Sequence, residues 1–506
     1  MSIALAQPSP TAGSTTVWQR YPTIYEINTW VWLNELSAKY KLPLDLSTVP
    51  STEWDAIASF GFDAVWLMGV WERSPSGVAI SNTNANLQRD FQQAMPDFHA
   101  EDNVGSPYCV RRYIVDQRLG GPHGLVAARR ELSKRGMKLV LDFVPNHVAP
   151  DHPWVTERPD FFVQGSTDEI KGRPESYFKA GDKIFACGRD PFFPAWPDVL
   201  QLNCYNADLR SAIVQILLQI AEQCDGVRCD MAMLVLNTIF GRTWAEAVGM
   251  VPTGDFWVEI ISAIKSLHPD FVFIAEAYWG LEWTLQQQGF DFCYDKTLYD
   301  RMEHGTAEDV RLHLCAGFDY QSKLLRFLEN HDEPRAAATF SSAKERAVAL
   351  AMATLPGAKL FHEGQFEGRK VRLPVFLARR PVEHFDRELH SFYARLLEAT
   401  SQRVFHEGQW SLSERTGWWD NDSYRNLLAW TWTLDNERYL IIVNFSDTPA
   451  QGLVRIPWQD AQHKTWHLID PISNDLYERD GYEMVSKGLY VALEGWHHHF
   501  FQFVAG

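Results

Sequence analysis

The sequence lacks any apolar run that could cross a membrane. None of its uninterrupted apolar segments approaches the roughly 18 residues that a membrane-spanning helix requires. The N-terminal segment MSIALAQPSPTAGSTT also lacks the basic start and the long apolar stretch of a secretory signal. We interpret residues 1–19 as a flexible lead-in instead. The sequence therefore predicts a cytoplasmic protein.

Cysteine and positive charge are both scarce. The seven cysteines form an odd number, with no CxxC pair and no regular spacing that would indicate a disulfide framework. Most of them lie in apolar runs and are expected to be small buried side chains in a reducing compartment, namely Cys204, Cys224, Cys229 and Cys293. The formal net charge of -17 argues against a nucleic-acid partner, whose phosphates require clustered Lys and Arg.

Internal repeats and low-complexity tracts are also missing, and the composition is that of a globular protein. Of the 506 residues, 46% are hydrophobic and 22% are charged. At about 150 residues per domain this length suggests roughly three domains, or two and an insertion if one is an α/β barrel. A core of this size needs no disulfide or metal for stability. The 20 tryptophans are expected mainly in that core, with some available to stack on a ligand.

Eight short, β-rich apolar segments recur along the first part of the chain and predict strands. Amphipathic segments between several of them predict helices, at 54–61, 124–136, 209–224, 256–267 and 343–355, and Asn206 or Asp208 is a candidate N-cap of the third. Strands that alternate with helices form a parallel sheet, and eight such units close into a (β/α)₈ TIM barrel. The predicted strands are 23–29, 64–70, 138–144, 226–232, 272–277, 290–295, 324–330 and 358–364.

Two features interrupt this alternation and predict further domains. About 80 residues separate the third predicted strand from the fourth, and the excess is rich in Pro, Asp and aromatic residues. We expect a small inserted domain at 148–205, flanked by the two parts of the barrel at 20–147 and 206–395. A second long segment, 71–112, follows the second strand. From residue 396 to 506, short strands separated by turn signals predict a C-terminal antiparallel β-sandwich.

Ionisable residues gather at the ends of several predicted barrel strands. In such barrels the active site lies at the carboxyl ends of the strands. The third strand ends with Asp142, Asn146 and His147, the fourth carries Arg228 and Asp230, the fifth ends with Glu276, and the seventh ends with His331 and Asp332. A single acidic residue at a strand end is usually a helix cap, but four strands together indicate one site.

Two carboxylates in this set have contrasting surroundings. Because strand side chains alternate, Arg228 and Asp230 point to the same side, where the arginine lowers the pKa of the aspartate and keeps it ionised. Such a fixed carboxylate is suited to nucleophilic attack. Glu276 lies in the apolar and aromatic run FIAEAYW, which raises the pKa of a carboxyl group and suits a general acid. Together they predict a glycosidase pair.

Four runs, LDFVPNH, DGVRCD, the glutamate of FIAEAYW and FLENHD, resemble in order and position the conserved regions of the α-amylase family, glycoside hydrolase family 13. The resemblance covers residues 20–365. It implies Asp230 as the nucleophile, Glu276 as the acid and base, and Asp332 as the residue that binds sugar hydroxyls. It further implies that Arg228 orients Asp230, that His147 and His331 contact the sugar, that Tyr108 stacks beneath it, and that Asp142 braces the site.

The sequence departs from the family pattern at two places. Met233 and Leu234 stand where many relatives carry Lys-His for the leaving-group side, so product length does not transfer, and apolar acceptor subsites would favour transfer over hydrolysis. Many relatives also bind a structural calcium, and Asn146 is present here, but Gln201 stands in the position of the calcium-binding aspartate. Since calcium favours carboxylates, a calcium ion is doubtful, and the chemistry itself requires no cofactor.

Three functions remain open at this stage. The leading one is a retaining hydrolase of α-1,4-glucans and maltooligosaccharides, and the alternative is a 4-α-glucanotransferase with the same chemistry. A non-catalytic carbohydrate-binding protein is the third. The histidines 497–499 are interpreted as structural and are expected on an edge strand of the sandwich. Glu363 and Glu367 lie near the eighth strand, where a structural loop role is favoured, with Glu363 at the barrel mouth as the alternative.

Overall fold

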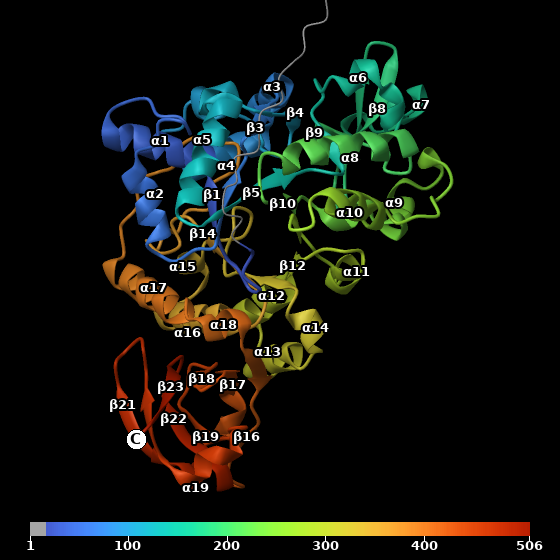
Figure 1. Cartoon of the computed structure of the whole chain (residues 1–506). Helices are drawn as coiled ribbons and strands as arrows, with labels where there is room; N and C mark the ends of the chain where they lie inside the picture. The colour runs from blue at the N-terminus through green and yellow to red at the C-terminus, as the bar shows by residue number, and fades with distance from the viewer. Residues whose placement is uncertain (1–16) are drawn as a thin grey trace, which may run out of the picture.

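The computed structural model describes residues 17–506, so nearly all of the predicted lead-in lies outside the described residues. Its centre is a closed parallel barrel with the strand order β1-β14-β13-β12-β11-β10-β5-β2 (Figure 1). All eight predicted strands are confirmed. They are β1 (Thr23–Asn28), β2 (Ala64–Met68), β5 (Lys138–Phe143), β10 (Gly226–Cys229), β11 (Val272–Ala275), β12 (Phe292–Tyr294), β13 (Leu324–Arg326) and β14 (Ala358–His362).

Each barrel strand divides its side chains between two cores. In β2, Val65 and Leu67 pack in the large core between the strands and the surrounding helices, whereas Trp66 and Met68 pack inside the barrel. In β10, Val227 and Cys229 belong to the outer core. This alternation turns Arg228 toward the barrel interior, where a parallel barrel is filled by side chains.

Helices cover the barrel at the predicted positions. The predicted helices correspond to α2 (Ser51–Ala58), α5 (Gly121–Lys134), α8 (Ala207–Ala221), α10 (Phe256–Leu267) and α16 (Ser342–Thr354). Asn206 is the N-cap of α8, since its side chain accepts hydrogen bonds from the backbone N–H groups of Asp208 and Leu209. Such a cap satisfies amides that have no partner within the helix, and it fixes where α8 begins.

The long segments after β2 and β5 build one wall of the barrel mouth. After β2 the chain forms β3 (Trp71–Arg73), α3 (Pro75–Thr83), α4 (Ala85–Ala94) and β4 (Val110–Val115), and β3 pairs with β4. Between β5 and β10 lies a four-stranded sheet with the order β6-β9-β8-β7, beside the short helices α6 (Trp154–Glu157) and α7 (Thr167–Gly172) (Figure 1). Its strands are β6 (His147–Val148), β7 (Tyr177–Ala180), β8 (Lys183–Gly188) and β9 (Trp196–Gln201).

The C-terminal part folds as two antiparallel sheets. One has the order β15-β17-β18-β23-β20-β21 and the other the order β16-β19-β22. Trp430 and Trp432 on β17 donate hydrogen bonds from their indole N–H groups to Thr354 at the end of α16, which fixes the larger sheet against the barrel. The strands are β15 (Gln409–Leu412), β16 (Arg415–Thr416), β17 (Leu427–Leu434), β18 (Glu437–Asn444), β19 (Ala450–Val454), β20 (Thr465–Ile469), β21 (Leu476–Asp480), β22 (Leu489–Leu493) and β23 (His498–Ala505).

The strand that carries His498 and His499 is central and not at an edge. The chain pairs β23 with β18 on one side and with β20 on the other, so the predicted edge position is wrong. The reason is the Greek-key return of the last strand into the middle of the sheet, which local sequence does not show. Cys204, Cys224, Cys229 and Cys293 are buried, as predicted. Over residues 17–506, every helix is too short or too polar to traverse a lipid bilayer.

Candidate active site

Seven of the eight predicted site residues form one connected cluster at the carboxyl ends of the barrel strands. Arg228 lies at its centre, fully buried beside Asp142 of β5 in the strand register. Its Nη1 donates a hydrogen bond of 2.8 Å to Asp230 Oδ1, and its Nη2 lies 2.8 Å from Glu276 Oε2. A single guanidinium therefore holds both predicted catalytic carboxylates.

Burial raises the pKa values of both carboxyl groups, which differs from the sequence expectation for Asp230. Burial raises the pKa of Glu276 to about 7, with the charge of Arg228 opposing it and that of Asp230 adding to it. Burial also raises the pKa of Asp230, although Arg228 opposes it through its charge and its hydrogen bond. The expectation of a lowered Asp230 pKa is therefore wrong, because the cost of desolvating a buried carboxylate exceeds the effect of an arginine shared with Glu276.

Glu276 has hydrogen-bond partners at both oxygens. Oε2 accepts the backbone N–H of Met231 at 2.5 Å, and Oε1 accepts the Tyr278 hydroxyl at 3.0 Å. Met231 adopts a left-handed conformation, with φ of 42°, in the turn that follows Asp230. That turn aims its amide at Glu276 and so couples the end of β10 to the end of β11.

Asp332 and His331 form the opposite side of the cluster. His331 Nε2 lies 2.9 Å from Asp332 Oδ2 and 2.6 Å from the Tyr108 hydroxyl, while Nδ1 contacts Glu26. Burial lowers the pKa of His331, but Asp332 and Glu26 raise it well above its usual value. Burial raises the pKa of Asp332, but the charge and hydrogen bond of His331, together with the charges of Arg228 and Arg372, lower it to about 2. The Asp332 side chain remains 47% exposed.

Tyr108 connects the two halves of the site. Its ring stacks on that of His331 with centroids 5.4 Å apart, and the Arg228 guanidinium lies 5.1 Å from its centroid. Asp142 of this cluster is fully buried, and it accepts hydrogen bonds from the Trp66 indole at 3.2 Å and from the Gly69 amide at 2.8 Å. Burial raises the Asp142 pKa, with Arg228 opposing it.

His147 lies beside this cluster and not within it. It is buried on β6 with its ring 5.4 Å from that of Trp196, and the Asn146 amide lies 3.2 Å from its Nδ1. Burial lowers its pKa to about 4, with a hydrogen bond to the backbone of Tyr108 opposing this. A neutral imidazole at this place can exchange hydrogen bonds with a sugar hydroxyl.

The residues at the expected calcium position do not fit a cation. Gln201 Nε2 donates hydrogen bonds to Asn146 O at 2.9 Å, to Asn146 Oδ1 at 2.9 Å and to Leu202 O at 3.0 Å. These oxygens would be the calcium ligands, and the amide N–H groups of Gln201 already occupy them. Elsewhere in the described chain, no cluster of three His, Cys, Asp or Glu side chains is arranged to hold a metal.

Two further sequence expectations concern residues that are buried. Met233 and Leu234 lie in the buried turn η5 (Ala232–Val235), packed in the core, so they do not line a leaving-group subsite. Glu363 accepts a backbone hydrogen bond from Asn28 at 3.3 Å and forms a buried ion pair with Arg380. The Glu367 carbonyl accepts the backbone N–H of Asp386 at 3.0 Å. Glu363 also lines a small hollow beside His331, so the structural role of both glutamates stays a prediction.

Three contributors were missed. Glu26 on β1 contacts His331, Tyr278 donates to Glu276, and the Tyr294 hydroxyl on β12 accepts a hydrogen bond of 3.3 Å from Arg228 Nε. Glu26 carried the same signal as Arg228, an ionisable residue inside an apolar barrel strand. The tyrosines gave no comparable signal, because tyrosine is common in apolar strands.

Comparison with known proteins gives the family. The family model of the α-amylase catalytic domain matches residues 51–427, which is more than half of the chain. The chain belongs to the α-amylase family. This match and the closed eight-stranded barrel confirm the resemblance inferred from the four sequence runs.

Individual relatives are distant. Alpha-amylase MalA of Haloarcula japonica is 25% identical over 447 residues, which cover 86% of this chain and 56% of that protein. An alpha-1,4-glucan:maltose-1-phosphate maltosyltransferase of Bifidobacterium longum is 25% identical over 257 residues, 47% of this chain and 27% of that protein. The chain thus spans about half or less of the length of these curated relatives. A noncanonic maltogenic alpha-amylase, AmyB of Thermotoga neapolitana, shares the fold, with a TM-score of 0.67 and 20% identity over 96% of this chain and 99% of that chain.

Proposed function

We propose that the chain hydrolyses α-1,4-linked glucans and maltooligosaccharides with retention of configuration, through a covalent glycosyl-enzyme on Asp230. The observation that carries the proposal is the position of Asp230 and Glu276 on neighbouring nitrogens of one guanidinium, each at 2.8 Å. Retaining enzymes need two carboxyl groups at about 5–5.5 Å from each other, whereas inverting enzymes place them farther apart to admit a water. A shared arginine favours the closer arrangement.

Glu276 would supply the proton to the leaving group. Oε2 of Glu276 accepts the Met231 amide and lies against the Arg228 guanidinium, so it has no room for a proton. The acidic proton therefore belongs on Oε1, beside the Tyr278 hydroxyl. A pKa of about 7 leaves a useful fraction protonated at neutral pH. Once Asp230 carries the sugar, its charge no longer raises the Glu276 pKa, and Glu276 is then better suited to accept a proton from water.

Asp332 and His331 would hold the sugar in the reacting position. With a pKa of about 2, Asp332 stays ionised and can accept hydrogen bonds from two hydroxyl groups. The His331 imidazolium beside it donates to the sugar or to Tyr108, whose ring forms a flat floor. Hydrogen bonds that strengthen as positive charge develops on the sugar lower the barrier.

A 4-α-glucanotransferase is the second candidate, and an aromatic pair at the mouth favours it. Phe192, in the loop between β8 and β9, and Trp279, three residues after Glu276, are both exposed and meet edge to face with centroids 5.0 Å apart. A sugar bound on these faces would sit on the leaving-group side of Glu276 and could outcompete water. The buried Met233 and Leu234 contribute nothing to this surface.

We further propose that the protein acts in the cytoplasm. Six of its seven cysteines are buried free thiols and the seventh is an exposed free thiol. Free thiols persist in a reducing compartment, whereas secreted proteins commonly pair them.

The substrate panel that tests the proposal contains maltose, maltotriose, maltohexaose, starch, pullulan, sucrose and trehalose. Chromatography of the products should give glucose and short maltooligosaccharides from the α-1,4-linked compounds, whereas longer chains from maltotriose would indicate transfer. Asp230→Asn is the matched control, since it keeps the side-chain shape but removes the nucleophile. Turnover of none of the seven by the wild type, or equal turnover by the variant, contradicts the proposal.

A further inference from the structure

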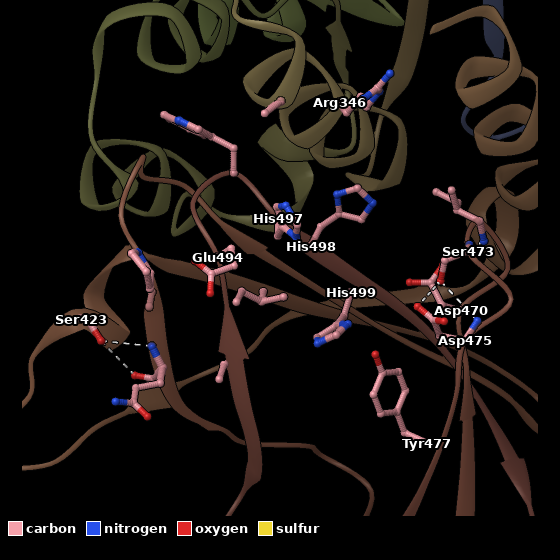
Figure 2. A pocket seen from close by; sticks show the side chains of 18 of the residues that line it. Arg346, Ser423, Asp470, Ser473, Asp475, Tyr477, Glu494, His497, His498 and His499 are labelled. Carbon is pink, nitrogen blue, oxygen red and sulfur yellow. Dashed lines mark hydrogen bonds between the residues drawn. The ribbon is translucent and has the colours of Figure 1, made fainter. Parts of the chain in front are cut away.

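A cavity of about 770 Å³ lies between the barrel helix α16 and the C-terminal sheets, away from the barrel mouth. This volume is within the range of roughly 300–1,000 Å³ that is typical of ligand sites. Figure 2 shows the rings of His498, His499 and Tyr477 in the middle of the hollow, between Ser423 and Glu494 on one side and Asp470, Ser473 and Asp475 on the other. No residue of the candidate active site lines it.

The cavity continues along the surface toward exposed aromatic residues. A second hollow of about 200 Å³ shares Tyr477, Ala492 and His499 with the first and is also lined by Tyr490 of β22. Tyr490 is 51% exposed, and the Trp418 ring packs edge to face against it with centroids 6.1 Å apart. The next residue, Trp419, is 98% exposed. We call the two hollows and these aromatics the sandwich groove.

The chemistry of the sandwich groove selects one class of ligand. Its lining carboxylates, Asp470, Asp475 and Glu494, outnumber its two lining arginines, Arg346 and Arg479, so the groove does not select an anion. Burial lowers the pKa of His498 to about 4, and burial also lowers that of His499, so both rings are neutral at neutral pH. Neutral imidazoles, carboxylates and amides combine donors with acceptors, as sugar hydroxyls require, and exposed indole and phenol rings cover the apolar face of a pyranose.

One buried donor or acceptor in the groove has no partner. His498 Nδ1 is buried without a hydrogen-bond partner within the described chain, although its ring lies against the cavity. A buried polar atom left unsatisfied costs free energy, but a ligand hydroxyl would reach this nitrogen only after the ring turns. Asp470 is engaged already, since it accepts backbone hydrogen bonds from Ile472, Ser473 and Phe500. Its position is therefore fixed before any ligand arrives.

We propose that the sandwich groove is a second, non-catalytic binding site for an α-glucan chain, with Tyr490 and Trp418 as stacking surfaces and His499, which lines both hollows, as a hydrogen-bonding partner. The substrate class rests on the proposed function, but the location does not. Such a site would hold a polymer on the protein while the barrel mouth acts on another part of the chain or on a neighbouring chain. It would raise the local substrate concentration for polysaccharides only.

Affinity electrophoresis in native gels that contain glycogen tests the proposal. The full-length Asp230→Asn protein serves as the parent, so that no polymer is degraded, and Trp418→Ala with Tyr490→Ala is introduced into it. Tyr482→Ala is the matched control, because Tyr482 is 67% exposed on α19 (Gly481–Ser486) and lines neither hollow. We expect the groove variant to bind glycogen at least about fivefold more weakly and the control to match the parent. Circular dichroism of each protein verifies folding.

A parallel measurement uses the active protein. The groove variant should lose activity on glycogen while its KM for the shortest maltooligosaccharide turned over stays within about twofold of wild type, as expected for a site that contributes only through tethering. Equal retardation of the groove variant and the control overturns the proposal, as does a parent that glycogen does not retard. Failure of the proposed function has a different signature, namely no turnover of any α-glucan by the wild-type protein.

Discussion

Arg228 Nη2 lies 2.8 Å from Glu276 Oε2, although these residues are 48 positions apart and come from different strands. The same guanidinium donates to Asp230 from its other nitrogen. Burial of two carboxyl groups at one point is tolerable only because this cation compensates them. The arginine therefore holds both groups at one point and opposes the rise of their pKa values on burial.

Replacing Arg228 by Met should be strongly destabilising at neutral pH. Without the guanidinium the folded-state pKa values of Asp230 and Glu276 rise further above their unfolded values, so the lost stability returns as the pH falls and both groups become protonated. We expect a loss of about 3–5 kcal/mol in unfolding free energy at pH 7 and a smaller loss at pH 4. Urea unfolding at both pH values measures it. A loss that does not depend on pH would contradict this electrostatic role.

The pH profile of kcat/KM should have its alkaline limb near pH 7. Glu276, with a pKa of about 7, must be protonated to act as the acid, so the rate falls as the pH rises through that value. Replacing Tyr278 by Phe removes a hydrogen bond to the ionised carboxylate, raises the Glu276 pKa and shifts this limb to higher pH. Initial rates on maltotriose between pH 4 and pH 9 test both statements. A limb that does not move would show that Tyr278 does not act on Glu276.

Chelation should leave the protein unchanged. Because Gln201 Nε2 already satisfies Asn146 and Leu202 oxygens, EDTA is expected to alter neither Tm nor activity. Gln201→Glu removes that donor and buries a carboxylate among oxygens, so Tm should fall in EDTA and partly recover with calcium. Differential scanning calorimetry with and without calcium measures the Tm of both proteins. A wild-type Tm that drops in EDTA would mean that a cation binds here after all.

The aromatic pair at the mouth should control the fate of the glycosyl-enzyme. Phe192→Ala removes one ring of the Phe192–Trp279 pair and opens the leaving-group side to water. With maltotriose as the substrate, we expect the variant to form a smaller proportion of longer transfer products relative to the shorter hydrolysis products. Trp283→Ala is the control, since Trp283 is similarly exposed but packs against Tyr320 instead. Equal product ratios in the two variants would remove the argument for an acceptor subsite.

Local sequence was sufficient to predict the barrel and the identity of the charged cluster. The alternation of strands and helices follows from the hydrophobic periodicity of the sequence. Arg228 and Asp230 stand out because charged residues are rare in an apolar strand. The pairing of Arg228 with Glu276 could not be predicted, because it depends on the register between β10 and β11. The burial of Met233 and the central position of β23 likewise depend on tertiary packing. The predicted domain boundaries and the roles of the individual site residues stay predictions.

The central claim is that Asp230 forms a covalent bond to the sugar, and trapping tests it most directly. The Glu276→Gln protein lacks the acid, so an α-maltosyl fluoride, whose leaving group needs little protonation, should form the glycosyl-enzyme while its hydrolysis is slow. Mass spectrometry of the intact protein followed by peptide mapping should find one maltosyl unit on the peptide that contains Asp230, and none when Asp230→Asn is added. An adduct on another residue, or turnover of the fluoride with no adduct at all, would contradict the account.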